Sequence, residues 1–358
     1  LMSGLVYDIC TVETSNRRLA EMVKFIVKRL LLGIFVLLGT SILIFTIARV
    51  VPGDVATIAL GSRATEAAKE ALREELYLND PLPIQYLKWL ADVLHGNFGN
   101  SFITKRAVRA DIVQFLPATI ELVLWSGIFM IIGTFGLGII AGKHKNTWID
   151  GLIRVLSYIG VALPAFVVGI LLLLLFGYKW PVIPVLGRLS SGVTAPATIT
   201  GLYIIDALLL GQFSVAGNAF LHLLLPAFAL AVGPIVQDAR VLRSSLVDNS
   251  TKEYMAVSTG NGLPPNLLIR KYLLKPSATS AITVMGMDFA ALLGNAFLVE
   301  KIFNWPGISR YGINAMLNKD LNAICAVVLI IGLTFFLVNL LVDLIIAALD
   351  PRMRIGES

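Results

Sequence analysis

Few residues of this sequence combine a reactive type with a spacing that chemistry can use. Asp288 and Asn295 lie seven positions apart in a long apolar stretch, so a helix would place both side chains on one face. An acidic side chain inside such a stretch is costly in lipid and normally faces a cavity or a partner. We therefore expect Asp288 and Asn295 to line a pore, with a hydrogen bond between packed helices as the alternative.

A second polar pair lies at the end of another apolar stretch. Arg240 and Arg243 are three positions apart, so they share one helix face. This spacing is typical of docking to a partner protein or of stabilising the loop that follows. Anchoring to anionic lipid headgroups is the alternative.

The polar segment 238–280 contains the run E-Y-M-A-V-S-T-G-N-G-L-P-P, which starts at Glu253. Asn249 or Ser250 could cap a short helix here, and Glu253 would favour the positive end of that helix. Gly262 suits a left-handed position at the carboxyl end, and the two prolines that follow prevent continuation. Such a helix could act as a rigid lever for a partner, or it could be an ordinary loop helix packed on its own protein.

Motifs for enzymatic chemistry are absent from the sequence. It has no G-x-x-x-x-G-K-[ST] phosphate loop, no H-E-x-x-H and no G-x-S-x-G. The three histidines are scattered, and two cysteines are too few for a disulfide framework or a thiolate metal site. We expect no catalytic residue, no metal and no bound cofactor in this chain.

Composition indicates a membrane protein. Hydrophobic residues make up 57% of the 358 positions and charged residues only 15%, against about 25% charged in soluble proteins. Prolines 164, 226 and 234 within the apolar stretches free backbone carbonyls and could mark bends. The stretches long enough to cross a membrane as helices are 30–48, 116–141, 155–177, 220–237, 281–299 and 324–349.

The distribution of lysine and arginine sets the predicted orientation. With the amino terminus inside, most positive charges outside the long segment 49–115 fall on cytoplasmic segments, and both termini are cytoplasmic. The net charge of +6 then reflects topology rather than a nucleic-acid partner. Segment 199–213 is apolar but short and has Asp206 at its centre, so we interpret it as an interfacial or re-entrant piece on the outer side.

The predicted architecture is an all-α polytopic membrane protein with six transmembrane helices. A small extracytoplasmic subdomain, containing helices near 64–77 and 84–94, follows the first of them. The acids within the spans, Glu121, Asp288 and Asp343, have no basic partner in the sequence pattern, and no inverted repeat is visible, which argues against a stand-alone secondary transporter or channel. The predicted parts are a cytoplasmic segment 1–29, a first span 30–48, the subdomain 49–115, a core of five spans 116–349 with the cytoplasmic loop 238–280, and a cytoplasmic tail 350–358.

Several motifs together resemble the permease subunits of ATP-binding-cassette (ABC) importers, in the dipeptide/oligopeptide/nickel branch. Glu253-Tyr254, Ser258 and Gly262-Leu263 resemble the "EAA" coupling motif of that family, with serine in place of its usual alanine. Ser309 and Asn295 stand where glycines are usual. The resemblance runs from about residue 22 to the tail through R-V-V-P-G-D at 49–54, H-G-N-F-G-N-S at 95–101, L-P-A-F at 163–166, H-L-L-L-P at 222–226, E-K-I-F-N-W-P-G-I at 300–308 and L-D-P-R at 349–352.

This resemblance implies a type I importer permease in the inner or plasma membrane, forming half of a pore. The implied partners are a homologous second permease, two ABC ATPase subunits that bind ATP and magnesium, and an extracytoplasmic solute-binding protein. The motif helix at 253–263 would sit in a groove on an ATPase. Di- or oligopeptides are the first expectation for the substrate, with oligosaccharides or a nickel chelate as alternatives.

Overall fold

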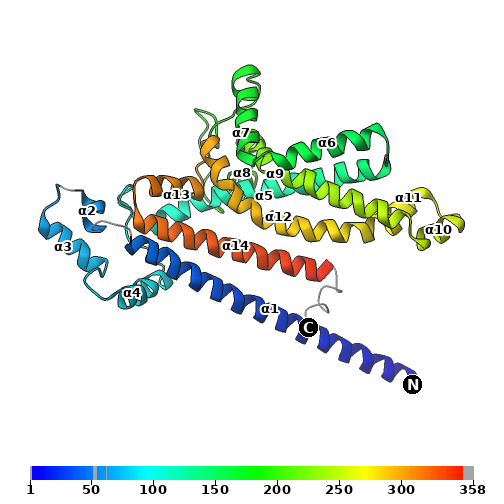
Figure 1. Cartoon of the computed structure of the whole chain (residues 1–358), viewed down its shortest axis with the longest axis horizontal. Coiled ribbons are helices and arrows are strands. Elements are labelled where there is room, and N and C mark those ends of the chain that lie inside the picture. Colours follow the sequence, from blue (N-terminus) through cyan, green and yellow to red (C-terminus); the bar gives the residue numbers. More distant parts are fainter. Residues whose placement is uncertain (1, 51–54, 62, 350–358) are drawn as a thin grey trace.

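The computed structural model describes residues 2–50, 55–61 and 63–349. Within these residues the regular elements are helices, and β pairing is limited to an isolated bridge between Asn100 and Ala107. Long helices run side by side along the molecule, and short helices gather at its two ends (Figure 1). The all-α prediction is confirmed. The tail 350–358 and part of the motif at 49–54 lie outside the described residues.

Five helical segments in the described part of the chain are long and apolar enough to cross a membrane. About 20 residues cross the hydrocarbon core, so α5 with 36 residues and α9 with 38 extend well beyond it. The five are Ile26–Arg49 within α1 (Met2–Val50), α5 (Val108–Lys143), α9 (Phe213–Ser250), Leu268–Ile302 with α12 (Lys275–Ile302), and Leu321–Ala347 within α14 (Leu321–Leu349).

Helix α9 lies at the centre of the bundle, where it packs against α5, α6, α7 and α12. Its contact with α5 is close because α5 presents glycines to it. A Cβ atom added at Gly138 or Gly142 would come within 2.8 Å of side-chain atoms of Leu242 or Leu246. Small residues allow membrane helices to approach closely, so these glycines set the separation of α5 and α9.

The predicted third span, 155–177, is not one straight helix. It is divided between α6 (Trp148–Ala162) and α7 (Ala165–Leu173), which continues into a π-helical turn, η1 (Leu174–Lys179). The two parts meet at 102°, and α7 stands away from the bundle (Figure 1). The cause is Pro164: it disfavours helical geometry in the preceding residue, and Leu163 has an extended ψ of 117°. Pro226 and Pro234, in contrast, lie inside the continuous helix α9.

The predicted subdomain that follows the first span contains α2 (Val55–Leu60), α3 (Glu66–Glu75) and α4 (Leu82–Leu94). The last two confirm the helices predicted near 64–77 and 84–94. Two helices are longer than the apolar stretches within them: α5 begins at Val108 and so includes residues 108–115, and α1 begins at Met2, so the span Ile26–Arg49 is part of one longer helix.

The predicted loop 238–280 is shorter than expected. Helix α9 continues to Ser250, and α11 (Pro265–Leu267) with the π-helical turn η2 (Leu268–Leu274) leads directly into α12. Polar residues do not by themselves end a helix. Where the helix leaves the membrane, its backbone hydrogen bonds continue and water solvates its polar side chains. The loop proper is residues 251–264, which contain α10 (Glu253–Gly260).

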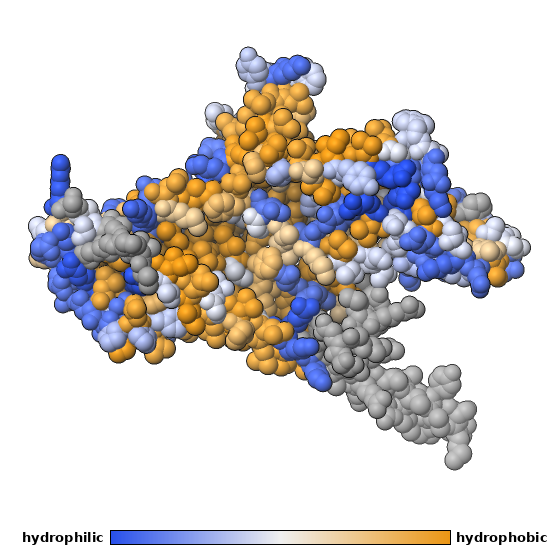
Figure 2. Space-filling model, in the orientation of Figure 1, coloured by the Kyte–Doolittle hydropathy of each residue, from blue (hydrophilic) through white to orange (hydrophobic). Residues whose placement is uncertain are grey.

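The surface has the pattern of a membrane protein. Hydrophobic residues cover the middle of the molecule, and hydrophilic residues gather at both ends (Figure 2). Two of the acids expected to be unpaired have basic partners: Asp343 pairs with Arg29 of α1 at 3.2 Å, and Glu121 pairs with Arg188. The prediction was wrong because both arginines lie outside the six apolar stretches.

The carboxylate of Glu300 in α12 is fully buried and joins three helices. It accepts hydrogen bonds from the Thr119 hydroxyl of α5 and from the Arg310 N–H of α13 (Ile308–Leu317), the latter at 2.9 Å. The Thr119 hydroxyl in turn accepts from the Ile308 N–H at 2.9 Å. Glu300 therefore supplies the cap for the first turn of α13 and connects it to α5.

Glu300→Gln is expected to lower the free energy of unfolding by about 1–3 kcal/mol. The amide keeps the shape but replaces one of the two acceptor oxygens by a donor, so a buried donor loses its partner. Thermal unfolding of the purified protein in detergent measures the effect. Lys301→Gln, an exposed change at the next residue, is the control, and equal stability of the two variants would contradict this role of Glu300.

Candidate functional site

A cavity of about 650 Å³ lies at the bend between α6 and α7. This size is within the usual range for sites that bind small molecules. Its walls come from segments that are far apart in sequence. They are residues 160–166 at the bend, 230–237 of α9, 288–298 of α12, Ser309 of α13 and Ile331 of α14.

Three polar side chains on facing helices line this cavity. Asp288 and Asn295 both contribute to its wall, as their spacing on one face of α12 requires. Gln237 of α9 lies opposite, and its Nε2 donates a hydrogen bond to Asp288 Oδ2 at 3.3 Å. Asp288 is the charged residue among those lining the cavity. Asp288 thus faces a cavity and also bonds a neighbouring helix, and its place in a pore stays a prediction.

Asp238 is a residue that sequence reasoning missed. It is fully buried, and its carboxyl group lies beside that of Asp288. Apart from that neighbour, neither of its oxygens has a hydrogen-bond partner among the described residues. Ending the fourth span at residue 237 assigned Asp238 to a loop. The signal that could have identified it is the helical spacing of apolar residues that continues past it in α9, at 235, 236, 239, 242 and 246.

The predicted short helix is present as α10 (Glu253–Gly260). It begins at Glu253 as expected, but neither Asn249 nor Ser250 caps it. Both belong to the end of α9, and Asn249 Nδ2 donates instead to Ser277 Oγ at 2.9 Å. Lys252 occupies the cap position without a side-chain hydrogen bond. The cap prediction was wrong because α9 extends further than its apolar pattern.

The carboxyl end of α10 matches the prediction. Gly262 has φ +74°, in the left-handed region that favours glycine. The Gly262 N–H donates to Thr259 O at 3.0 Å and the Leu263 N–H to Ser258 O at 3.4 Å, which is the hydrogen-bond pattern of a Schellman motif. Ser258 and Leu263 of the motif thus meet through their backbones, and the end of α10 is fixed.

The side chains of α10 face away from the protein. None is buried, and Tyr254 and Val257 expose 37% and 62% of their surface. Glu253 is also exposed. The helix contacts η2. It is a defined helix whose apolar and acidic side chains are available at one end of the molecule (Figure 1).

The two arginines near the end of α9 have different environments. Arg243 donates through Nε and Nη2 to the two carboxylate oxygens of Asp150, at 2.8 and 2.7 Å. Asp150 lies in the first turn of α6 and is fully buried. Arg240 is exposed. Sharing a helix face did not give them a common role: Arg243 holds α6 against α9, and Arg240 alone faces outward.

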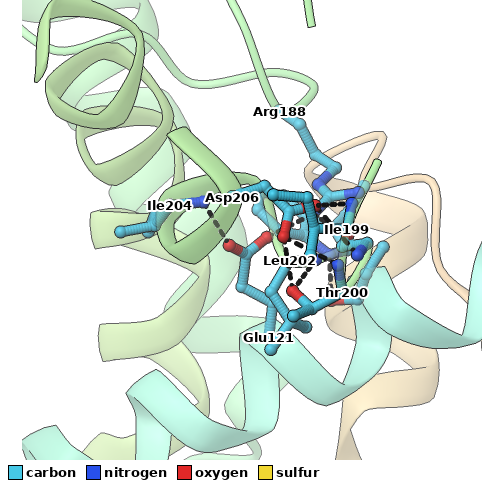
Figure 3. Close-up of polar contacts among 10 residues, drawn as sticks. Glu121, Arg188, Ile199, Thr200, Leu202, Ile204 and Asp206 are labelled. Carbon is cyan, nitrogen blue, oxygen red and sulfur yellow. Dashed lines mark hydrogen bonds and ion pairs between the residues drawn. The ribbon is translucent and has the colours of Figure 1, made fainter. Parts of the chain in front are cut away.

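A polar cluster joins α5 to the segment that precedes α9 (Figure 3). Glu121 of α5 pairs with Arg188, and its Oε1 accepts from the Ile204 N–H at 2.8 Å. The Arg188 guanidinium lies 3.5 Å from the centre of the Tyr203 ring. This cluster holds α8 (Tyr203–Leu209) against the bundle and explains why segment 199–213 forms a seven-residue helix rather than a span.

Asp206 fixes the turn that precedes α8 (Figure 3). Its carboxylate is buried and accepts from the Thr200 hydroxyl at 2.6 Å and from the N–H groups of Thr200 and Gly201 at 2.8 and 2.9 Å. Burial alone would raise the pKa of Asp206. The hydrogen bonds from the Thr200 hydroxyl and the backbone N–H groups outweigh it, and the pKa lies below its usual value.

Asp206 is therefore expected to make stability depend on acid. Because its pKa is lower in the folded state, its contribution is complete above the unfolded pKa, about 3.9, and is lost as the pH falls through the folded pKa. Thermal unfolding from pH 7 to pH 3 measures this. Asp206→Asn should lower stability at pH 7 by about 1–3 kcal/mol and flatten the acid dependence.

The control is Asp248→Asn, which removes an exposed aspartate of α9. This variant should keep the acid dependence of the unchanged protein. An Asp206→Asn variant with that same dependence would contradict the role of Asp206.

Comparison with known families matches nearly the whole chain. Residues 134–355 match the model of a family described as binding-protein-dependent transport system inner membrane component. Residues 22–123 match the amino-terminal part of such membrane components. The two matches cover the outer subdomain, the cavity and α10.

Three relatives are similar over almost their full length. A probable D,D-dipeptide transport system permease of Escherichia coli is 33% identical over 90% of this chain and 95% of its own. A dipeptide transport system permease of Alkalihalophilus pseudofirmus is 34% identical over 93% of this chain and 100% of its own. A glutathione transport system permease of Pectobacterium atrosepticum is 32% identical over 93% of this chain and 99% of its own.

Proposed function

This chain belongs to the family of binding-protein-dependent transport system inner membrane components, and from that premise we propose that it forms one half of the pore of an importer of di- or oligopeptides. It is a multi-pass membrane protein and a permease subunit of an ABC transporter rather than a catalytic subunit. ATP hydrolysis is proposed to take place on two separate ATPase subunits.

The observation that carries this proposal is the form of α10. A short helix with no buried side chain and a fixed carboxyl end is suited to fit into a groove on another protein. Tyr254 and Val257 supply exposed apolar contact surface, and Glu253 and Arg240 supply charges around it. ATP-driven closure of the ATPases would move α10 as a rigid body and switch the pore between inward- and outward-facing states.

The second permease is proposed to cover α7. This helix stands away from the bundle (Figure 1), and one of its faces is uncovered: Ile170 and Leu171, with Leu174 of η1 that follows, are each more than 40% exposed. A helix that is apolar all round needs lipid or another helix against each face. A homologous permease would supply such a surface and would complete the pore around the cavity.

The orientation follows from charge and from these contacts. The end that carries α10 is proposed to be cytoplasmic, with both termini on that side, because most lysines and arginines outside the long outer segment lie there. The opposite end, with α2, α3 and α4 (Figure 1), would then face the solute-binding protein. The peptide substrate is inferred from the relatives, which are dipeptide and glutathione permeases.

Gly262→Val is expected to uncouple transport. Valine at φ +74° is strained by roughly 1–2 kcal/mol or more, so the end of α10 would be rebuilt and uptake would fall about tenfold. Uptake of a radiolabelled dipeptide by cells that contain the complete importer measures it, with the amount of permease in the membrane determined in parallel.

The matched control is Gly217→Val. Gly217 is an exposed residue of α9 with helical backbone and open space where the side chain would lie. This variant should transport normally. A Gly262→Val permease that reaches the membrane and transports as fast as the Gly217→Val permease would show that α10 is not the coupling helix.

A further inference from the structure

A buried pair of carboxyl groups lies where α9 and α12 meet at the cavity. Asp288 lines the cavity, and Asp238 lies beside it. Asp238 is fully buried, and apart from the adjacent Asp288 carboxyl group neither of its oxygens has a hydrogen-bond partner among the described residues. In the described residues, no lysine or arginine forms an ion pair with either group. The pair is therefore not a structural salt bridge.

Two neighbouring carboxylates in a medium of low dielectric cannot both remain charged, because each disfavours the ionised form of the other. One proton shared between Asp238 and Asp288 leaves a single negative charge on the pair. A buried charge needs a partner of opposite sign or several hydrogen-bond donors. Among the described residues, the donor to this pair is the Gln237 amide, at 3.3 Å from Asp288 Oδ2. The remaining negative charge faces the cavity.

The rest of the wall also offers acceptors. Asn295 and Gln237 each present an amide oxygen as well as an amide nitrogen. Pro234 inside α9 frees the Leu230 carbonyl from its helical hydrogen bond, and Leu230 lines the cavity. Acceptors around one negative charge match a group with several N–H donors and one positive charge. An ammonium group, with three donors, has that chemistry.

A metal ion fits this site less well. No group of three or more histidine, cysteine, aspartate or glutamate side chains that could hold a metal ion occurs among the residues that the structure describes. Two carboxyl groups with amide neighbours offer fewer and weaker ligands than a structural metal site requires. The cavity of about 650 Å³ is also far larger than a single ion and has room for a small peptide.

We propose that Asp238 and Asp288 form an anionic subsite that binds the ammonium group of the transported solute inside the cavity. Asp288 contacts the ammonium group, and Asp238 holds the shared proton behind it. This inference rests on the proposed function and extends it. The permease itself, in addition to the solute-binding protein, selects solutes with a free amino group over acylated peptides and neutral sugars.

Uptake of two matched peptides tests the subsite. Cells with the complete importer are given radiolabelled trialanine or N-acetyl-trialanine, which differ in the ammonium group alone. We expect the unchanged permease to take up trialanine faster than N-acetyl-trialanine. This preference should fall about tenfold in Asp288→Asn and in Asp238→Asn, because each variant removes part of the negative charge that would pair with the ammonium group. Both variants remove a costly buried carboxyl group, so folding should not suffer.

The matched control is Asp248→Asn, which removes one exposed carboxylate from the same helix α9. It should keep the preference of the unchanged permease. An Asp288→Asn permease that retains this preference would overturn the proposal, as would a loss of preference in Asp248→Asn of the same size.

A second measurement does not depend on transport. A hydrophobic carbodiimide modifies protonated carboxyl groups within membranes, and mass spectrometry of open membrane fragments locates the modified residue. Trialanine should protect Asp238 and Asp288, whereas N-acetyl-trialanine should not. Protection without peptide uptake would support the subsite and contradict the proposed peptide import. Modification that neither peptide reduces would overturn the subsite, even in a functioning peptide importer.

Discussion

In hydrocarbon each backbone N–H and C=O group needs a partner within the protein, and the arrangement of this chain follows from that requirement. Long unbroken helices meet it in α5, α9, α12 and α14. The helical backbone is interrupted at Leu163 and Pro164, where α6 ends and α7 begins at an angle of 102° to α6. The cavity lies at this interruption, because backbone that leaves a helix is tolerated in a membrane where it borders a polar space.

The sequence predicted local features well. Helices α3 and α4, the left-handed Gly262 and the shared face of Asp288 and Asn295 depend on neighbours within one or two turns. Residues far apart in sequence were missed. Arg188 and Glu121 are separated by 67 positions, and Arg243 and Asp150 by 93. Periodicity carries no information on such pairs, since it describes one helix at a time.

The ends of the long helices were misjudged for a different physical reason. Hydropathy marks the part of a helix that lipid covers, whereas hydrogen bonds continue into water. Helix α9 continues beyond residue 237 to Ser250, and this continuation places Asp238 inside the bundle and Arg243 against α6. The candidate site thus depends on residues that composition assigned to a loop. Helix α9 therefore forms part of the cavity wall, bonds α6 through Arg243 and leads into the loop that contains α10.

The bond between Arg243 and Asp150 has a mechanical consequence. Two parallel N–H···O contacts at 2.8 and 2.7 Å resist both sliding and rotation of α6 on α9. In the proposed mechanism, a force applied at α10 would be transmitted to α6 and α9 as one stiff arm. The compliant point of that arm would be the junction at Pro164, where the ladder of helical hydrogen bonds is interrupted between α6 and α7. Displacement at the membrane surface would be converted there into a change in the width of the cavity, so a single proline would serve as the fulcrum.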